Sequence, residues 1–541
     1  MLKILNSQSK TITGAAIILS GATLLSRFVG IIRDRVLAHY YGAGPITDAY
    51  YAAFKVPDLI YNLLIVGALT AGFIPVFTSL LNEKDKNSSA MQLANNILNI
   101  LGLALIILCG LGMVFTPAFT KIIAPGFSGE NLQRVIMFTR IMFLSPIFLG
   151  ISMIMGGVLQ SLRRFTLYAI APIFYNFGII FGATAIVRVM GESGLAWGVI
   201  LGAFLHCILQ IYGAWHAGWR YHFVFNIQDI GTRLIAKLMI PRTLGLAISQ
   251  INLVVITILA SFLPTGSIAV FNYANNLQAV PIGIFAIPFA LAIFPSLSLA
   301  ATQKDNTKFV ELITNVIRQI LFLIIPSAVL ILLLRAQIVR VILGSGEFDW
   351  TATINTADAL AFFSLGLIAQ ALIPIFSRAF FALSNTKTPF VISVISELIS
   401  IIAALVFMKP LGAPGLALAS SIGVTVNLIL LWINLRLITK TLNESNILSL
   451  IYPVSLAALV MGVIVQILKY PLATLFNQQY FWGIFGQGVI AAIVGIIVYC
   501  TLCYILKVPE FIQIKDSFAR RWLKLRNIQT IEMIENIENK E

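Results

Sequence analysis

Long apolar segments recur along almost the whole chain, and they constrain its fold more than any other feature. Each spans 20 residues or more, which is enough to cross a bilayer as an α-helix. The segments are continuous, whereas strands of a membrane β-barrel alternate apolar and polar residues over about ten positions. Fourteen are found, at 12–32, 46–81, 92–118, 135–158, 166–187, 194–217, 243–262, 267–300, 310–334, 355–376, 389–408, 412–435, 447–468 and 480–506.

Composition excludes the other classes of protein. Charged residues make up only 11% of the 541 positions and hydrophobic residues 59%, against about 25% charged residues in an ordinary soluble domain. A soluble enzyme, a secreted disulfide scaffold or a disordered chain would need far more polar surface. The sequence therefore predicts an all-α polytopic membrane protein with about 14 transmembrane helices.

The basic residues indicate an orientation. The net charge is +15, which in a soluble protein would suggest a nucleic-acid partner, but here it fits cytoplasmic loops, so no nucleic-acid partner is expected. Lys and Arg number 23 in the termini and even-numbered loops and 9 in the odd-numbered loops. The bias places both termini in the cytoplasm of a bacterial inner-membrane protein. Cys500 and Cys503 lie in an apolar run with no further metal ligands nearby, so we interpret the cysteines as apolar packing residues.

Two parts of the sequence repeat with an offset of about 220 residues. The segment around 49–77 resembles that around 269–297, and the segment near 158 resembles that near 380. An even number of spans in each copy makes the repeats parallel, as in one class of secondary transporter. We predict a first six-helix lobe over 1–225, a second over 226–440, two extra helices over 441–508 and a basic amphipathic cytoplasmic tail over 509–541.

Polar residues inside the first two predicted spans indicate a cavity, because charge in a membrane span usually faces a cavity or a partner. In the first helix, Arg27, Gly30 and Asp34 share one face, and Arg33 reaches the same cavity only if the helix bends or ends near Gly30. The alternative for Arg33 is a solvated helix end, and for Arg27 an internal ion pair. The candidate binding residues of this helix are Ser26, Arg27, Gly30, Arg33 and Asp34.

The second and eighth spans carry matching polar stripes. Asp48, Lys55, Asp58 and Asn62 are spaced by 7, 3 and 4 residues, which puts them on one face of a helix. The equivalent stretch of the second repeat is neutral and contains Asn275 and Asn276. The stripes predict either a cavity wall that binds a transported anion, such as a phosphorylated one, or a structural network between helices.

Glu397 is a lone carboxylate in an apolar span, with Ser393 one turn before it. It is a candidate site for a coupling ion or proton, and the alternative is a protonated carboxyl bonded to a neighbouring helix. We expect no cofactor and no metal, with a monovalent cation or the membrane potential as the driving force. We find no phosphate-binding glycine loop, metal-ligand set or catalytic triad, so the sequence does not predict an enzyme.

Three motifs resemble the MviN/MurJ family of lipid II flippases, which belongs to the multidrug/oligosaccharidyl-lipid/polysaccharide exporter superfamily. The longest is LLSRFVGIIRDRVLAHYYGAGPITDAYYAAFKVPDLIYNLLIVGALTAGFIPVF, and GSGEFDW at 344–350 and SRAFFALSNTKTP at 377–389 support it. The resemblance implies two lobes in a V shape around a central cavity, alternating access, and a groove at helices thirteen and fourteen for the lipid tail. It implies flipping of lipid II from the cytoplasmic to the outer leaflet for peptidoglycan synthesis, cell shape and cell-wall biogenesis, with the cell-wall synthesis machinery and membrane lipids as partners.

The resemblance carries family positions onto Ser26, Arg27, Arg33, Asp34, Asp48 and Lys55, with Arg27 and Arg33 meeting the pyrophosphate or the sugar-peptide head group. Family members with further charges differ here, since this chain has Tyr61 and Asn62 in place of two arginines, Val66 in place of an acid, Asn276 in place of an arginine and Ala279 in place of an acid. The predicted cavity is therefore less positive. Three alternatives stay open: a flippase for another polyprenyl-linked oligosaccharide, a cation-coupled small-molecule exporter, and a membrane scaffold without transport.

Overall fold

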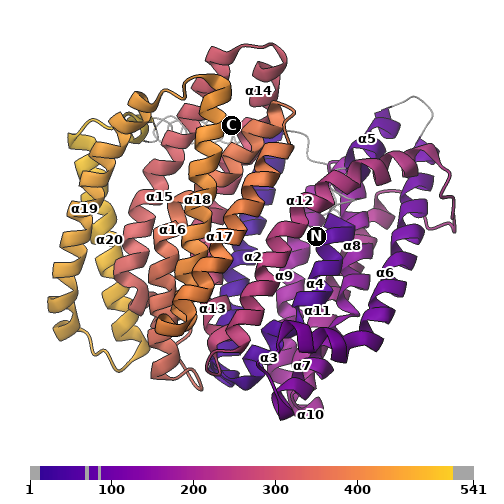
Figure 1. Ribbon diagram of the computed structural model, residues 1–541, viewed down its shortest axis with the longest axis horizontal. Helices are drawn as coiled ribbons and strands as arrows, with labels where there is room; N and C mark the ends of the chain where they lie inside the picture. The colour runs from indigo at the N-terminus through magenta and orange to yellow at the C-terminus, as the bar shows by residue number, and fades with distance from the viewer. Residues whose placement is uncertain (1–11, 67–71, 83–86, 514, 516–541) are drawn as a thin grey trace, which may run out of the picture. The chain divides into compact units, whose positions relative to one another are not determined.

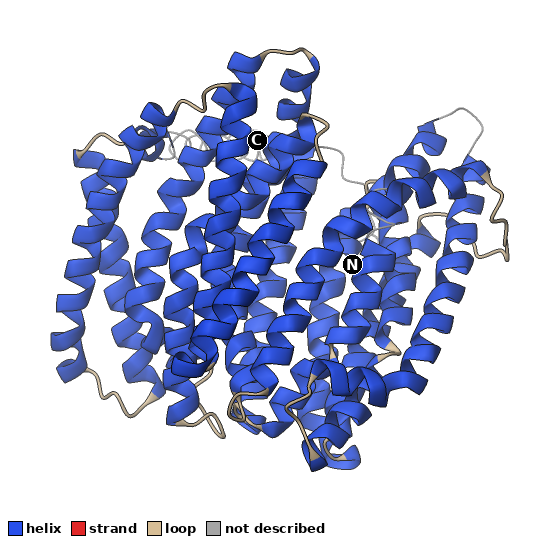
Figure 2. Ribbon diagram, viewed as in Figure 1, coloured by secondary structure: helices blue, strands red, loops and turns tan. Residues whose placement is uncertain are grey.

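The computed structural model describes residues 12–66, 72–82, 87–513 and 515, and every regular element in that part of the chain is a helix (Figures 1 and 2). The first half contains α2 (Ile12–Tyr41), α3 (Pro45–Ala53), α4 (Lys55–Tyr61), η1 (Asn62–Val66), α5 (Ile74–Asn82), α6 (Asn87–Ile123), α7 (Gly129–Met142), α8 (Ser145–Ser161), α9 (Phe165–Phe181), η3 (Gly182–Ile186), α10 (Val187–Met190), α11 (Ser193–His216) and α12 (Ile230–Ser261). The second half contains α13 (Ser267–Pro281), η4 (Ile282–Ala286), α14 (Ile287–Thr302), α15 (Asn306–Ile342), α16 (Trp350–Ala382), α17 (Lys387–Leu411), α18 (Ala413–Thr439), α19 (Glu444–Leu475) and α20 (Phe481–Ile505).

Eleven helical stretches of the described chain are long and apolar enough to cross a membrane. They coincide with eleven of the fourteen predicted segments. The other three predicted segments are occupied by α2, by the stretch from α3 to α5, and by α12. The prediction of an all-helical polytopic membrane protein is therefore confirmed.

Several helices extend beyond the predicted segments, and in α2 and α12 the added residues include charged ones. The first segment was expected to end at residue 32, but α2 continues to Tyr41, so Arg33 lies within the helix rather than at a solvated end. The seventh segment was expected to begin at 243, but α12 begins at Ile230, where the side chain of Asp229 accepts a hydrogen bond from the N–H of Thr232. In α2 the added residues Arg33 and Asp34 pair with each other, whereas Arg233 and Lys237 in the added part of α12 are exposed, and in both stretches the charges interrupt the apolar pattern of a membrane span.

The two longest predicted segments, 46–81 and 267–300, are broken helices, and the breaks match. The α-helical hydrogen bonding gives way to a π-helical turn at Asn62–Val66 in the first and at Ile282–Ala286 in the second, starting 220 residues apart (62 and 282). A second pair of turns agrees: Arg163 and Ser384 adopt positive φ angles of 59° and 57°. The internal repeat seen in the sequence is thus repeated in local backbone geometry.

Two compact units make up the chain. The first contains Met1–Val280, Val339–Phe363 and Phe390–Gly423, and the second contains Pro281–Ile338, Ser364–Pro389 and Val424–Glu541. The division of the chain at residues 225 and 440 into predicted lobes stays a prediction. The predicted tail helix falls mainly on residues outside the described part of the chain.

Within the first unit, α9 packs between α2 and α11, and α11 also packs on α8. Glycines allow the closest of these contacts: Gly178 of α9 and Gly182 of η3 face Gly202 and Gly198 of α11, with no room for a Cβ atom at any of them. Small residues at such interfaces let helix backbones approach closely in a membrane. This packing places the polar side of α9 against the charged part of α2.

Within the second unit, α19 packs along α20, and the hydroxyl of Tyr499 donates a hydrogen bond to the carbonyl of Phe322 in α15. A buried ion pair joins Arg318 of α15 to Glu510, five residues after the end of α20. The same guanidinium donates to the backbone carbonyl of Asn446 near the start of α19. These contacts tie three helices and the beginning of the tail together at one end.

Candidate functional site: a polar cavity in the first unit

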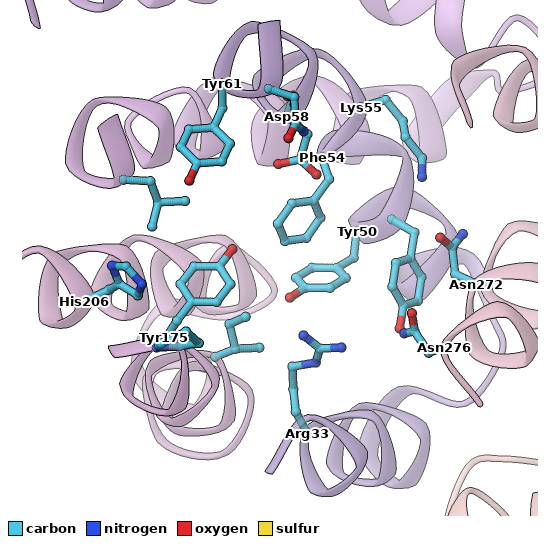
Figure 3. A pocket seen from close by; sticks show the side chains of 15 residues that line it. Arg33, Tyr50, Phe54, Lys55, Asp58, Tyr61, Tyr175, His206, Asn272 and Asn276 are labelled. Carbon is cyan, nitrogen blue, oxygen red and sulfur yellow. Dashed lines mark hydrogen bonds between the residues drawn. The ribbon is translucent and has the colours of Figure 1, made fainter. Parts of the chain in front are cut away.

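A cavity of about 440 Å³ lies within the first unit. It is lined by side chains from α2, α3, α4, η1, α8, α9, α11 and α13, and Figure 3 shows them converging on it. Its lining is unusually polar for a space among apolar helices. The lining residues are Arg33, Tyr50, Tyr51, Phe54, Lys55, Asp58, Tyr61, Asn62, Leu149, Pro172, Tyr175, Ile179, His206, Asn272 and Asn276.

The break in the second predicted span gives this cavity one of its walls. Lys55, Asp58 and Asn62 of the predicted polar stripe all line the cavity, as the helical spacing required. Asn62 also donates from Nδ2 to the backbone carbonyl of Asp58 at 2.9 Å. The stripe follows the helix from α4 into the π-helical turn, so the change of helix type occurs beside the cavity.

A hydrogen-bond network holds Arg33 at the cavity. Its Nε and Nη2 donate to Oδ1 of Asp34 at 3.0 and 2.7 Å, and its Nη1 donates to Oδ1 of Asn176 in α9 at 3.0 Å. The other oxygen of Asp34 accepts a 3.0 Å hydrogen bond from Nδ2 of Asn276 in α13. The network joins α2, α9 and α13, and Asp34 offsets the charge of the guanidinium.

Lys55 has a different electrostatic setting. Among the described residues it takes part in no hydrogen bond and no ion pair, and Asp58, three residues later, is the acid that lines the same cavity. Its ammonium group projects into the cavity in Figure 3. The lining thus contains two cations and one acid, and Lys55 is the cation whose hydrogen-bond donors are available to a ligand.

Asp48 lies outside the cavity lining, although it belongs to the predicted stripe. Its side chain is buried, and its two oxygens accept hydrogen bonds from the backbone N–H groups of Gly266 at 2.6 Å and Ala269 at 2.8 Å. These groups lie at the start of α13, where the first N–H groups of a helix have no partner within the helix. In this structure Asp48 acts as a side-chain cap for α13, supplied by a different helix.

The remaining residues predicted in α2 also lie away from the cavity lining. Ser26, Arg27 and Gly30 are half-buried, and a Cβ atom built on Gly30 meets no described atom within 4 Å. Arg33, six residues after Arg27, reaches the cavity although α2 does not end near Gly30. The structure therefore does not bring Arg27 and Arg33 together at this cavity.

The amides predicted in the second repeat are partly in place. Asn276 lines the cavity, and Asn275 accepts a 3.0 Å hydrogen bond from Nε2 of Gln278. Asn272, one turn before Asn276 in the same polar stretch, also lines the cavity. Glu397 and Ser393, the candidate coupling-ion residues, lie on α17 and are half-buried. Within the described residues, no group of three or more His, Cys, Asp or Glu side chains could hold a metal ion.

Aromatic residues and one histidine are the part of the lining that our sequence analysis missed. Tyr50, Tyr51 and Phe54 come from the same helical stretch as Lys55, while Tyr175 and His206 come from α9 and α11. Aromatic residues in membrane helices are most often packing residues, so their type gives no signal of a cavity. Only the position of Tyr61, one residue before Asn62 of the polar stripe, pointed to this wall.

Comparison with known proteins identifies the family. Residues 37–486 match the family described as "Lipid II flippase MurJ", which is well over half of the chain. The chain belongs to the MurJ family. Probable MurJ flippases of Buchnera aphidicola are similar to it: that of subspecies Acyrthosiphon pisum is 30% identical, over 86% of this chain and 93% of its own. The MurJ lipid II flippase of Burkholderia cenocepacia is 28% identical, over 78% of this chain and 83% of its own.

Solved structures give the same result for the fold. A structure titled "Lipid II flippase MurJ, inward closed conformation" has a TM-score of 0.76 and 26% identity, covering 90% of this chain and 98% of that one. A multidrug transporter of the MATE family in the MOP superfamily has a TM-score of 0.64 at 17% identity, covering 79% and 99%, and that likeness concerns the fold alone. The MurJ family consists of transporters, so this member is a multi-pass membrane protein and not an enzyme.

Proposed function

We propose that this MurJ family member flips lipid II from the cytoplasmic to the outer leaflet of a bacterial inner membrane for peptidoglycan synthesis. The observation that carries the proposal is the cavity itself, in which Arg33, Lys55 and Asp58 meet amide and phenol side chains among membrane-spanning helices. A head group of sugars, peptide and pyrophosphate would lose its hydration in hydrocarbon, at several kcal/mol for each unpaired polar group. A polar cavity replaces those interactions while the lipid tail stays in the bilayer.

The mechanism that we propose is alternating access, with the cavity open to one side of the membrane at a time. Both termini lie in the cytoplasm in this proposal, as the excess of basic residues in the even-numbered loops indicates. A membrane potential negative inside favours outward movement of an anionic head group, by about 2.3 kcal/mol per charge per 100 mV. The second driving force that we propose is a cation that returns inward beside Glu397. The proposal also includes a groove for the lipid tail at α19 and α20. The cell-wall synthesis machinery is its proposed partner.

Transport in liposomes tests the function. The purified protein is reconstituted, fluorescent lipid II is placed in one leaflet, and its appearance in the other leaflet is measured with and without a membrane potential. We expect flipping by the wild type, and a loss of at least tenfold in Lys55→Gln, because that ammonium group is available to the pyrophosphate. The control is Lys121→Gln, which changes an exposed lysine of α6.

Two further variants separate the parts of the mechanism. Arg27→Ala tests the anion-binding role that the family resemblance implies for a residue outside the cavity lining. Glu397→Gln should slow flipping only when an ion gradient is applied, if the carboxyl binds the coupling cation. A folded wild type that moves no lipid II but moves another polyprenyl-linked oligosaccharide would contradict the assignment of the substrate, and transport of small cationic drugs alone would indicate an exporter.

A further inference from the structure

One side of the cavity differs chemically from the other. Figure 3 shows Tyr61, Tyr175 and His206 together on one side, away from Lys55 and Asn272. None of these three residues belongs to the network around Arg33. We call the side that they form the His206 side. It contains no Lys or Arg, and the imidazole of His206 carries a positive charge only when it is protonated.

The contacts of His206 fix the position of its ring and leave Nε2 as the ring nitrogen that is free to bind a ligand. Its Nδ1 lies 2.6 Å from Oγ of Ser152, and the same hydroxyl donates a 3.1 Å hydrogen bond to the backbone carbonyl of His206. A serine hydroxyl has one proton, so it donates either to the carbonyl, with Nδ1–H as the donor to Oγ, or to Nδ1 itself. Nε2 is an acceptor in the first case and a donor in the second, and a ligand hydroxyl can pair with it in both. Ser152 is fully buried, which holds the ring in place.

Nε2 of His206 has no partner of its own among the described residues. His206 is 8% exposed, and Nε2 makes no hydrogen bond with any residue that the structure describes. The ring lines the cavity, so a ligand there is what can satisfy the nitrogen. The hydroxyl of Tyr61 is likewise without a hydrogen-bond partner among the described residues. Both groups line the cavity without a protein partner, so a ligand in the cavity can supply their hydrogen bonds.

Charge decides which part of a head group fits. Asp58 lies beside Tyr61 and acts electrostatically on both Tyr61 and Tyr175. A phosphate or a peptide carboxylate would be repelled there, since a like charge at close range costs energy in a low-dielectric site. An uncharged group rich in hydroxyl and amide donors would not. Tyrosine rings add flat apolar faces, against which the C–H face of a sugar ring can pack.

We propose that the His206 side is a saccharide subsite, which binds the uncharged sugar part of a polyprenyl-diphosphate-linked head group while Lys55 binds the phosphates. The proposal rests on the function proposed above and adds a specificity-determining role for His206 and Tyr61. A site built to hydrogen-bond hydroxyl or amide groups discriminates strongly against a ligand that lacks them, because its own buried groups are then left unpaired.

Binding of two lipids tests the subsite directly. Undecaprenyl diphosphate carries the phosphates without sugars, and lipid II carries both. The affinity of the full-length protein in detergent for each lipid is measured for the wild type, Tyr61→Phe and His206→Phe, with thermal unfolding as a check of folding. Tyr168→Phe is the matched control, because Tyr168 lies on α9 outside the cavity lining. Tyr61→Phe removes only the hydroxyl and keeps the ring.

The expected result is selective. Tyr61→Phe and His206→Phe should weaken lipid II binding about tenfold each, equivalent to about 1.4 kcal/mol, and leave undecaprenyl diphosphate binding unchanged. Lys55→Gln should weaken binding of both lipids. Equal losses for the two lipids in Tyr61→Phe, or no loss for either, would overturn the saccharide subsite even if the wild type flips lipid II. Selective losses in a protein that does not flip lipid II would support the subsite and contradict the proposed transport.

Discussion

The carboxylate of Asp48 accepts a hydrogen bond from the backbone N–H of Ala269, 221 residues later. Asp48 lies at the start of the second predicted span, and Ala269 lies at the start of its counterpart in the second repeat. One copy of the repeat therefore supplies the cap for the equivalent helix of the other. The cap lies within the first unit and beside the polar cavity rather than in it.

Removing this cap should lower stability without altering ligand contacts in the cavity. Asp48→Ala leaves the N–H groups of Gly266 and Ala269 without their acceptor, which we expect to cost about 1–2 kcal/mol. Asp48→Asn keeps one acceptor oxygen and should cost less. Thermal unfolding in detergent measures both variants, and lipid II affinity of the folded protein at low temperature should stay within about twofold of wild type. A loss of affinity with no change in stability would show that Asp48 contacts the ligand after all.

The pair Arg33 and Asp34 should behave as one unit in mutational tests. Asp34→Asn leaves the guanidinium without its acid and releases the amide of Asn276, so we expect a loss of about 1–3 kcal/mol. Arg33→Gln removes the other member. The double variant should lose less than the sum of the two, by about 0.5–3 kcal/mol, because groups in one hydrogen-bond network are coupled. Additive losses in chemical unfolding would mean that the contacts between the two side chains contribute nothing to stability.

The close approach of α9 and α11 predicts that alanine at Gly202 lowers stability. Alanine at Gly110 of α6, outside this contact, should raise it. A Cβ atom at Gly202 would overlap the backbone carbonyl of Tyr175, so Gly202→Ala must push the helices apart and move Tyr175 and Asn176. We expect a loss of about 1–3 kcal/mol and weaker lipid II binding. Gly110→Ala is the control, because a Cβ atom there meets no described atom within 4 Å, and alanine favours a helix by about 0.5–1 kcal/mol. The two thermal midpoints should shift in opposite directions, and equal shifts would rule out the steric explanation.

The second unit allows a comparison of a buried ion pair with an exposed one. The side chains of Arg318 and Glu510 are 9% and 6% exposed, whereas that of Arg436, paired with Glu444, is 62% exposed. Glu510→Gln leaves a buried cation without its partner and should cost about 3–5 kcal/mol. Arg436→Gln should cost less than about 1 kcal/mol. Unfolding in detergent measures both variants, and a small effect of Glu510→Gln would mean that the start of the tail is not held by this pair.

The sequence alone determined the class of protein and much of its internal order. Continuous apolar segments could be satisfied only by membrane-spanning helices, because a helix pairs its own backbone groups where no water is available. The repeat was visible because each copy keeps its own pattern of prolines and polar residues, and the matching turns at Arg163 and Ser384 follow from local sequence. The stripe of Lys55, Asp58 and Asn62 was predictable for the same reason, since helical spacing is a local property.

Only the tertiary structure decided which polar residues share a cavity. Arg27 and Arg33 have the same residue type and neighbouring positions, but just one of them lines it, because the packing of α9 and α13 against α2 selects the face. Asp48 fits the polar stripe in sequence, but its carboxylate accepts hydrogen bonds from the backbone at the start of α13 and does not line the cavity. His206 gave no signal at all, since its environment is built by Ser152 from another helix. Spacing fixes a side chain on its own helix, whereas its partner depends on which helix packs there.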